Sequence, residues 1–568
     1  MIGIDLGTTN SAIAVWRDGQ SRLIPNSLGH VLTPSAVSVD DDGRILVGMA
    51  ARERQVTHPG RTATTFKRYM GTNRVTRLAD RDFLPEELSA LVLSSLKADA
   101  ERHLGESVSS AIITVPAYFN DKQRKATRRA GELAGLKVDR LINEPTAAAL
   151  AYGIDRRAAE TKYLVFDLGG GTFDVSILEI FEGVIEVRAS TGDSYLGGED
   201  FNEVLIQDML LRYKAELGFA SREQDPGLYE ILRDQAERAR RQLSIEANAT
   251  MRISWKGQYF EHSVTSEHFA AKCQSLLNRL RDPVMRAMRD SKVDLTQLKE
   301  IVLVGGATRM PIVRRTVTRM FGRFPATELN PDEAVAIGAA IQAGLKARDA
   351  ALKEVVLTDV CPYTLGVDIG EQRPDGSLRG DIFAPIIERN TVIPASREKH
   401  FATIQDAQAK IRFNVYQGES RIASENICLG TIEMPVPPRR RGEVSVACRF
   451  SYDVNGLLEI DVQESTTGEK RHLTVFDRDQ DASEADMRER REKLAAIKLH
   501  PREADANRAA LARGTRCYEH FLGYQREEIG RIISTFEVAL DTQDPSSADR
   551  ARVQFLSALD RLEGKSFL

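Results

Sequence analysis

An apolar strand followed by a glycine-rich turn occurs twice in the N-terminal part of the chain. One copy is YLVFDLGGGTFD (163–174), and the other is IGIDLGTTNSAIAVW (2–16), with the same order of strand, Asp-Leu-Gly, turn and second strand. A single turn of this kind is typical of an ordinary hairpin, whereas two copies indicate duplication. We therefore expect a duplicated α/β fold in which two hairpins face each other across a cleft.

Helical periodicity predicts the elements around these strands. Apolar residues at helical spacing indicate a helix over 86–103, and a second helix is expected after the apolar strand that ends at Pro116. The segments 141–153 and 330–344 contain helices of mostly small residues, which suits them to cross each other closely between the duplicated halves. Residues 199–300 are predicted to be mostly helical and charged.

Two further segments carry candidate binding residues. In ERARRQLS (237–244) four polar residues recur at helical spacing and therefore lie on one face of a helix, and such a face is usually solvated. The four residues are Glu237, Arg240, Arg241 and Ser244. EIVLVGGATRMP (300–311) is an apolar strand that runs into Gly-Gly and then a helix. In open α/β sheets a ligand lies near such a turn.

The pattern changes after residue 352. A short apolar segment within 353–359 contains Val355, Val356 and Leu357. An apolar linker is expected to dock on a neighbouring domain, because exposed apolar side chains are unfavourable in water. The alternative is an ordinary strand inside a continuous domain. From 360 to 478 apolar and polar residues alternate, for example in KIRFNVYQ (410–417), and Asn455-Gly456 is a hairpin turn signal. These residues are predicted to form an antiparallel β-sandwich.

The last segment, 479–568, is predicted to be helical. Ser483 and Asp486 form a capping box at its start, and Pro501 and Pro545 break it into separate helices.

The composition is that of a globular protein with several domains. The chain has 568 residues, 42% of them hydrophobic, and a net charge of −4, which argues against nucleic acid as the main partner. No apolar run approaches the length of a membrane span, and Met1 leads directly into the first strand, so we expect a cytoplasmic protein with no membrane partner. The five cysteines have no paired or metal-binding spacing and are expected to be free and buried. Arg439, Arg440 and Arg441 follow two prolines and are expected on a solvated loop.

The glycine turns are suited to bind phosphate. Glycine lets the backbone adopt positive φ and approach a ligand without a Cβ in the way, so the N–H groups of 169–171 can point at an anion. Asp167 and Asp174 would repel that anion directly, which indicates a hard cation such as Mg²⁺ between them and the phosphates. Lys67 is flanked by aromatic residues and could carry its charge into the cleft, although a lysine taken alone is more often solvated.

Seven segments resemble the signature sequences of the DnaK-type heat-shock chaperones. They are IGIDLGTTNS, ITVPAYFND, INEPTAAALAYG, VFDLGGGTFDVS, LGGEDF, VLVGGATRMP and NPDEAVAIGAAIQA. The resemblance runs through nearly the whole chain and is strongest to the HscC branch, through TDVCPYTLGV, IIERNTVIP and a shortened first lobe. It implies an actin-like ATPase domain (1–352), a linker (353–359), a β-sandwich that binds peptides (360–478) and a helical lid (479–568).

The family resemblance implies an ATP-dependent molecular chaperone. Binding and hydrolysis of ATP, with Mg²⁺, would control the binding and release of short apolar segments of client polypeptides. The expected partners are these clients, a J-domain co-chaperone and a nucleotide exchange factor.

The resemblance also implies roles for individual residues. The catalytic set would be Lys67, Glu144, Thr172 and Asp174. Phosphates would be held by Gly7, Thr8, Thr9, Asn10, Gly170, Gly171 and Thr172, and Mg²⁺, largely through its waters, by Asp5, Asp167 and Asp174. Adenosine would be enclosed by Glu237, Arg240, Arg241, Ser244, Gly305, Gly306, Arg309 and Asp332. Pro116 and Arg124 would relay the nucleotide state to the linker, and the peptide cleft would be lined by Phe401, Ile404, Ile411 and Phe413, with Val367 and Ile369 opposite.

Some positions depart from the family pattern. Arg240 replaces a common lysine, and Ala307 replaces a hydroxyl or amide, so adenosine contacts are expected to be fewer. Ile404 and Ile411 stand where smaller residues are common, which predicts a narrow pocket and weak peptide binding.

Two other classes of protein account for part of the pattern. A small-molecule kinase of the actin-like superfamily would use both phosphate loops but gives no use to a sandwich and lid. A filament-forming ATPase is the third reading. Sedimentation with ATP separates the filament, and phosphate release with and without apolar peptide separates the kinase from the chaperone.

Overall fold

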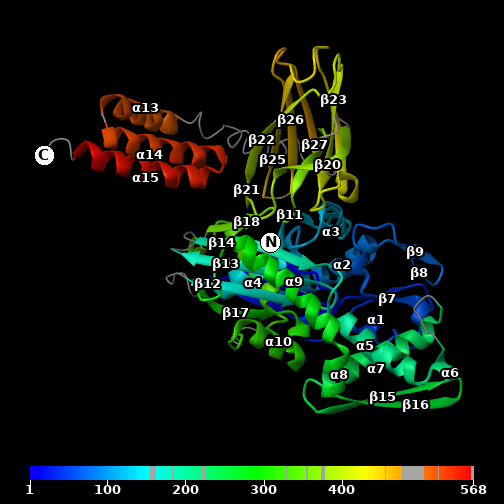
Figure 1. The fold of residues 1–568 in the computed structure, drawn as a ribbon. Helices are drawn as coiled ribbons and strands as arrows, with labels where there is room; N and C mark the ends of the chain where they lie inside the picture. The colour runs from blue at the N-terminus through cyan, green and yellow to red at the C-terminus, as the bar shows by residue number, and fades with distance from the viewer. Residues whose placement is uncertain are drawn as a thin grey trace. The chain divides into compact units, whose positions relative to one another are not determined.

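The computed structural model describes residues 1–153, 161–181, 184–218, 224–326, 330–352, 356–372, 378–454, 456–475, 505–521 and 523–564. Its elements group into two compact units, Met1–Pro362 and Tyr363–Leu568 (Figure 1). Each unit is described by itself.

Two mixed sheets in the first unit are built on the same plan. Their strands are β1 (Ile2–Asp5), β2 (Asn10–Arg17), β3 (Gln20–Ile24), β4 (Leu32–Pro34), β10 (Ser110–Val115), β11 (Lys137–Asn143), β12 (Thr161–Leu168), β13 (Phe173–Phe181), β14 (Val184–Asp193), β17 (Leu298–Val304) and β18 (Val356–Val360). The first sheet has the order β11-β10-β1-β2-β3, with β4 beside β2, and the second has the order β17-β12-β13-β14-β18 within this unit.

The equivalent strands carry the two sequence repeats. In each sheet the strand before Asp-Leu-Gly, β1 or β12, pairs antiparallel with the next strand and parallel with a later one, β10 or β17. The duplicated α/β fold predicted from the repeat is therefore confirmed.

Helices connect and cover these sheets. They are α1 (Met49–Arg52), α2 (Pro85–Leu104), α3 (Asp121–Leu133), α4 (Glu144–Gly153), α5 (Gly198–Arg212), α6 (Lys214–Leu217), α7 (Pro226–Gln242), α8 (Ser266–Lys272), α9 (Gln274–Ser291), α10 (Pro311–Phe321) and α11 (Ala334–Lys346). The predicted helix over 86–103 is α2, where the Glu87 side chain accepts a hydrogen bond from the Leu84 N–H and Gly105 ends the helix with a φ of 70°.

The two helices of small residues cross as the sequence predicted. They are α4 and α11, and they pack directly against one another. A Cβ added at Gly338 of α11 would lie only 1.7 Å from the carbonyl oxygen of Ala147 on α4. The absence of a side chain at this position therefore allows the two backbones to touch.

Gly338→Ala is expected to destabilise the first unit. The added methyl group would overlap a backbone oxygen that cannot move without shifting α4, and overpacking of a core costs about 1–3 kcal/mol or more. Thermal unfolding of the variant measures this cost. Gly60→Ala is the matched control, because a Cβ there meets no atom within 4 Å; equal melting temperatures for both variants would show that the helix crossing tolerates a side chain.

The segment 199–300 contains strands that the sequence analysis missed. Asn248–Trp255 (β15) and Gln258–Thr265 (β16) form an antiparallel hairpin beside α7. Alternate residues of β15, such as Ala249, Met251 and Ile253, are buried, which is the period of a strand rather than of a helix. The helix that carries Glu237 also ends earlier than expected, at Gln242, so Ser244 lies just beyond it.

Five shorter strands complete the first unit. They are β5 (Ala36–Val39), β6 (Ile45–Val47) and β7 (Thr62–Thr64), which form one sheet, and β8 (Thr76–Leu78) and β9 (Arg81–Phe83), which form a hairpin.

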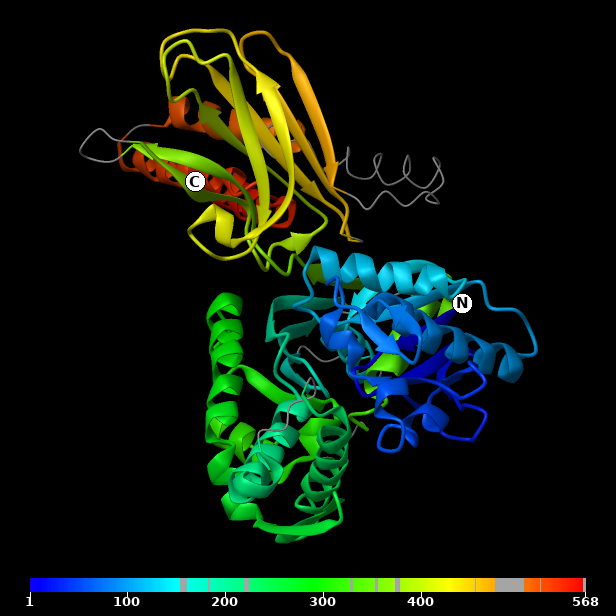
Figure 2. The same ribbon diagram turned by 90° about the vertical axis from the view of Figure 1, so that its right-hand side faces the viewer.

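The second unit contains an antiparallel β-sandwich (Figure 2). Its strands are β19 (Leu365–Gln372), β20 (Leu378–Ile387), β22 (Ala395–Ala402), β23 (Lys410–Gln417), β24 (Ile427–Pro435), β25 (Ser445–Tyr452), β26 (Leu458–Glu464) and β27 (Lys470–Val475), and the short strand β21 (Val392–Ile393) lies outside both sheets of the sandwich. One sheet has the order β20-β19-β23-β24, and the other has the order β22-β25-β26-β27. In β23 the predicted alternation is confirmed, since Ile411, Phe413 and Val415 are buried. Asn455 lies outside the described residues.

Three helices at the end of the chain pack together. They are α13 (Asp505–His520), α14 (Gly523–Asp541) and α15 (Pro545–Gly564). The rings of Phe536 and Phe555 stack in their core with centroids 4.7 Å apart. Pro545 begins α15 as predicted, whereas Ser483, Asp486 and Pro501 lie outside the described residues.

All five cysteines are free. Four are buried as expected, but Cys428 is exposed on β24, so that part of the prediction is wrong. Along β24 the buried residues are Ile432 and Met434, and the strand end that carries Cys428 is partly open to solvent. No helix among the described residues is long and apolar enough to cross a membrane.

Candidate nucleotide site

A cavity of about 600 Å³ opens in the first unit between the two repeated hairpins. It brings together the residues predicted for the nucleotide and its cation, with the exception of Gly171 and Asp174. These residues are Asp5, Gly7, Thr8, Thr9, Asn10, Lys67, Glu144, Asp167, Gly170, Thr172, Glu237, Arg240, Arg241, Ser244, Gly305, Gly306, Arg309 and Asp332.

The two glycine turns touch each other at the floor of the cavity. A Cβ at Gly170 would lie 2.0 Å from Thr9 Oγ1, and one at Gly171 would lie 2.8 Å from Thr8 Cγ2. Neither these two glycines nor Gly169 has a positive φ. The expectation that glycine is needed here for a positive φ is therefore wrong. Their role is close approach, because any side chain would force the turns apart.

Of the three aspartates near the turns, Asp167 and Asp174 are buried and Asp5 is half-buried, and the surroundings of all three disfavour their charged forms. Burial, with the charge of Glu144, raises the pKa of Asp5 to about 7 and that of Asp174 to about 8. The same two causes raise the pKa of Asp167 well above its ordinary value. Asp167 Oδ2 is buried without a hydrogen-bond partner. This set of oxygens fits a divalent cation, which would favour the charged carboxylates and use the free lone pairs.

Direct ligands to such a cation are few in the chain itself. No group of three or more His, Cys, Asp or Glu side chains in the described segments has the spacing of a metal-ligand set. The aspartates would therefore act mainly on the waters of the ion, as Mg²⁺ sites commonly do.

Lys67 and Glu144 form a buried ion pair at the cavity wall. Lys67 lies in the short turn of helix after Thr65, is only 2% exposed, and its Nζ is 2.6 Å from Glu144 Oε1. The Lys67 Nζ also lies 5.6 Å from the centre of the Phe119 ring. Glu144 is the first residue of α4, where the N-terminal helix dipole favours its negative charge. Lys67 is thus a cation inside the cleft and not a solvated surface residue.

A chain of hydrogen bonds leads from this region to β18. The Tyr118 N–H donates to Asp174 Oδ1, and Arg124 holds the same loop through the carbonyls of Ala117 and Phe119. The loop begins at Pro116, whose carbonyl accepts from the Phe119 N–H.

The chain continues on the other side of Arg124. Its guanidinium donates to Asn143 Oδ1 at 2.6 Å, and Asn143 Nδ2 donates to the Asp359 carboxylate at 3.0 Å. Burial raises the pKa of Asp359. Asp359 lies in β18, which pairs parallel with β14 so that Val356 is opposite Val184 and Leu357 opposite Ile185. Val355 lies outside the described residues.

The turn after β17 forms another wall of the cavity. Gly305 has a φ of 81°, and a Cβ there would lie 2.3 Å from the carbonyl oxygen of Leu168. Arg309 donates to Asp332 Oδ2 at 2.7 Å and to Asn330. These contacts fix a polar wall beside the second glycine turn.

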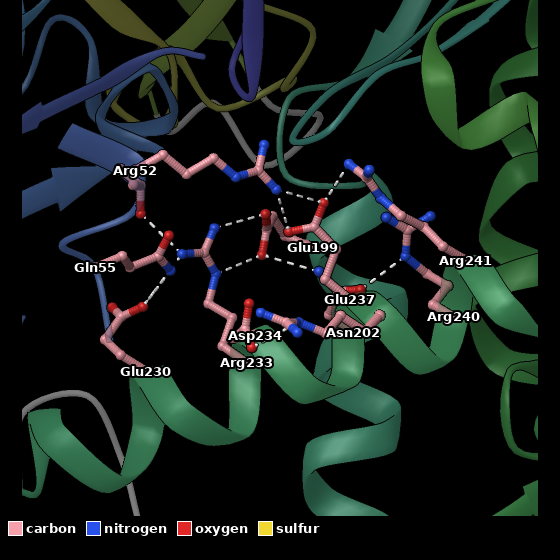
Figure 3. Close-up of polar contacts among 12 residues, drawn as sticks. Arg52, Gln55, Glu199, Asn202, Glu230, Arg233, Asp234, Glu237, Arg240 and Arg241 are labelled. Atoms are coloured by element: carbon pink, nitrogen blue, oxygen red, sulfur yellow. Dashed lines mark hydrogen bonds and ion pairs between the residues drawn. The ribbon is translucent and has the colours of Figure 1, made fainter. Parts of the chain in front are cut away.

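A network of charged and polar residues joins the two halves of the first unit, and Glu237, Arg240 and Arg241 of this network line the cavity (Figure 3). Arg52, at the end of α1, donates to Glu237 on α7 at 2.9 Å, and Arg241 contacts the same carboxylate at 2.6 Å. Gln55 donates to Glu230 at 2.6 Å.

The network continues along α7. Arg233 binds Glu199 through two hydrogen bonds of 2.7 and 2.8 Å and donates to Thr64 in the opposite half. Although burial opposes it, Arg233 lowers the pKa of Glu199 to about 2. Arg240 donates to Asn202 at 2.7 Å. Three of the residues predicted to enclose adenosine, Glu237, Arg240 and Arg241, are therefore also members of this network.

Comparison with known proteins decides the family. The family described as Hsp70 protein matches residues 1–531. The chain belongs to the Hsp70 family. It is 44% identical to the chaperone protein DnaK of Thermotoga maritima and of Thermotoga petrophila over 489 residues, which are 84% of this chain and 80% of each relative. It is 42% identical over 490 residues to the chaperone protein DnaK of Thermosipho africanus, with the same coverage.

Membership of the Hsp70 family establishes the activity of the chain. It is an ATP-dependent chaperone and an ATPase, and the fold described above is that of the family. The expectation drawn from the seven segments is confirmed at this level.

The residues that the Hsp70 resemblance assigned to peptide binding lie in the sandwich. Val367, Ile411 and Phe413 are buried between its sheets, and the Phe401 ring meets the Phe413 ring edge-on at 5.4 Å. Ile369 is half-buried. Ile404 is 38% exposed, and its Cδ1 would lie 3.0 Å from a Cβ at Gly370 of β19. The loop that carries Ile404 therefore reaches across to β19.

Several residues around the Hsp70 nucleotide cavity were missed from the sequence. Gly198, Val304, Met310 and Arg314 line it, and Arg52 contacts Glu237 of its lining. The segments LGGEDF and VLVGGATRMP contain the first three and could have indicated them. Nothing local marks Arg52, because its partner Glu237 is far away in the sequence.

Proposed function

We propose that the cavity of this Hsp70 protein binds ATP and ADP with the phosphates on the two glycine turns. The observation that carries the proposal is that both turns meet at one cavity whose walls hold Lys67 and Glu144 together with Asp5 and Asp167. Backbone N–H groups of the turns would hold the phosphates. The adenosine would lie between the end of α7 and the turn after β17, against Arg240, Arg309 and Asp332.

The chain supplies the groups that hydrolysis needs. Phosphoryl transfer depends mainly on positioning and on neutralising charge around the transferred group. Lys67 would stabilise charge at the γ-phosphate and orient the attacking water. Glu144, which holds the Lys67 ammonium in place, and Thr172 on the second turn would complete the arrangement. The buried ion pair keeps the Lys67 position fixed before the substrate arrives.

Asp5, Asp167 and Asp174 would hold Mg²⁺ largely through its waters. The ion would neutralise the β- and γ-phosphates. The raised pKa values of Asp5 and Asp174 and the unpaired Oδ2 of Asp167 support this assignment.

We further propose that β18 carries the nucleotide signal out of the ATPase domain. The hydrogen bonds from Asp174 through Tyr118, Arg124 and Asn143 to Asp359 end on this strand. The domain layout that follows is an ATPase domain over 1–352, a linker over 353–359, a peptide-binding sandwich over 360–478 and a lid over 479–568.

The partners follow from this layout. We propose that the clients are unfolded or extended polypeptides with short apolar segments, and that a J-domain co-chaperone and a nucleotide exchange factor act on the ATPase domain. A cytoplasmic location and a place in the HscC branch stay predictions from the sequence.

Phosphate release with and without an apolar peptide tests the proposal. ATP hydrolysis that rises several-fold with a Leu-rich peptide supports coupled peptide binding. ATP turnover that does not respond to the peptide, and in which the phosphate is transferred to a small molecule instead of to water, would favour a kinase. ATP-dependent sedimentation of the chain would favour a filament.

Ile404→Ala and Ile411→Val are each expected to strengthen binding of a Leu-rich peptide. Ile404 covers Gly370 at the open end of the sandwich, and Ile411 faces the interior of the sandwich. Removing methylenes makes room for a client leucine, whose burial contributes ~1.5–3 kcal/mol. Fluorescence anisotropy of a labelled peptide measures the change.

Ile460→Val is the matched control for the Ile411 variant. Ile460 is buried in the other sheet, on β26, so the control removes the same methylene without widening the predicted cleft. Unchanged or weaker affinity in both test variants would show that the isoleucines do not limit the pocket.

A further inference from the structure

Three consecutive arginines lie on a loop that is joined to the loop of Ile404. The first loop, 436–444, connects β24 to β25, and the second, 403–409, connects β22 to β23. The backbone of Ala407 donates to the Arg439 carbonyl at 2.8 Å, and that of Gly442 donates to the Thr403 carbonyl at 2.9 Å. The Arg441 N–H donates to Asp406 Oδ1 at 2.8 Å. Both loops therefore form one end of the sandwich.

The joined loops are held in a defined position beside the predicted peptide cleft. Val436 donates to the Ala409 carbonyl and Thr403 to the Val444 carbonyl, each at 3.0 Å, so the loops are paired at both ends. Ile404, whose N–H donates to Gln408 Oε1, extends from the same assembly toward Gly370. Pro437 and Pro438 restrict the backbone before the arginines.

The guanidinium groups are exposed and available. Arg439, Arg440 and Arg441 are exposed, and no ion pair joins them to an acidic side chain in the described part of the chain. By contrast, the cations of the neighbouring strand, Lys410 and Arg412, are both paired to Glu433. The two loops also carry Asp406 and Glu443, so their net charge is three minus two, or +1.

We propose that these arginines select client segments whose apolar core is flanked by acidic residues. The proposal rests on the proposed peptide-binding function of the sandwich. A guanidinium can bind a carboxylate through two parallel hydrogen bonds, and arginine side chains on the rim can reach chain that leaves the cleft. The apolar residue would enter beside Ile404 while acidic neighbours remain in solvent near the arginines.

Fluorescence anisotropy with the full chain and ADP tests this selection. Three labelled peptides share one Leu-rich core and differ in flanks of Asp, Ser or Lys. We expect the Asp-flanked peptide to bind roughly threefold to tenfold more tightly than the Ser-flanked one, since exposed charge pairs contribute modestly, and the difference to shrink as salt screens the charges. The Lys-flanked peptide should bind most weakly.

The variant Arg439→Gln, Arg440→Gln, Arg441→Gln should remove the preference and leave the Ser-flanked affinity unchanged. The matched control removes three exposed arginines of the first unit, with Arg281→Gln, Arg289→Gln and Arg319→Gln, and should keep the preference. Arg440→Gln alone should lose part of it, which guards against misfolding of the triple variant.

The outcomes distinguish failure of this proposal from failure of the proposed peptide binding on which it rests. Failure of all three peptides to bind would overturn both. Binding without dependence on flank charge, or a preference that survives in the triple variant, would overturn only the selection. Equal binding of an Asp-rich peptide that lacks the leucines would also overturn it, because the arginines would then be a general anion site.

Discussion

Lys67→Met is expected to lower the rate of ATP hydrolysis by about a hundredfold to a thousandfold, the loss typical when one charge-stabilising donor is removed from an active site. Affinity for ATP should change little, because backbone N–H groups and the cation carry most phosphate contacts. Methionine keeps the length of the buried side chain and removes only its ammonium group. Single-turnover hydrolysis and a nucleotide-binding titration measure the two effects separately.

The structure requires a second variant beside this one. Removing the Lys67 charge leaves Glu144 unpaired among three aspartates, and an unpaired buried charge is itself destabilising. The double variant Lys67→Met, Glu144→Gln restores neutrality and should stay equally inactive. Lys97→Met removes a half-buried lysine on α2, outside the cavity, and should hydrolyse ATP normally. A Lys67→Met protein that retains more than about a tenth of the parent rate, a barrier increase below ~1.4 kcal/mol, would rule out the proposed role.

Leu357→Asp is expected to abolish the acceleration of peptide release by ATP. Leu357 packs against the core between α4, α11 and the second sheet and pairs with Ile185 of β14. A carboxylate there would prevent β18 from docking while both domains stay folded. The expected loss is a coupling of roughly 1–3 kcal/mol, which is typical between allosteric sites. Peptide dissociation rates with and without ATP measure it.

Val356→Asp provides a matched comparison one residue away. Val356 is 51% exposed, so a carboxylate at this position costs less and should reduce the coupling only in part. Circular dichroism and basal hydrolysis confirm that each variant is folded. If ATP accelerates release equally in Leu357→Asp and in the parent chain, the segment is only a tether.

Local patterns were sufficient for the elements and for the architecture. The Asp-Leu-Gly repeat predicted two equivalent hairpins, the alanine-rich segments predicted a close helix crossing, and alternation after residue 360 predicted the sandwich. Each of these features is set by residues adjacent in sequence, since hydrophobic period and side-chain size act on the nearest turn or strand. The hairpin of β15 and β16 carries the same kind of alternating signal, in Ala249, Met251 and Ile253, but it lies within the segment predicted to be mostly helical.

Only the tertiary structure decided which charged residues belong to the site. From the sequence alone, a lysine at position 67 is more often a solvated surface residue, and its burial depends on Glu144, which lies 77 residues away along the chain. The sequence around Arg52 did not indicate its role, because its contact with Glu237 forms only when α1 approaches α7. The partner of a charged residue cannot be predicted from the sequence, because the pair forms only when packing brings the two groups together and removes the water that would otherwise solvate them.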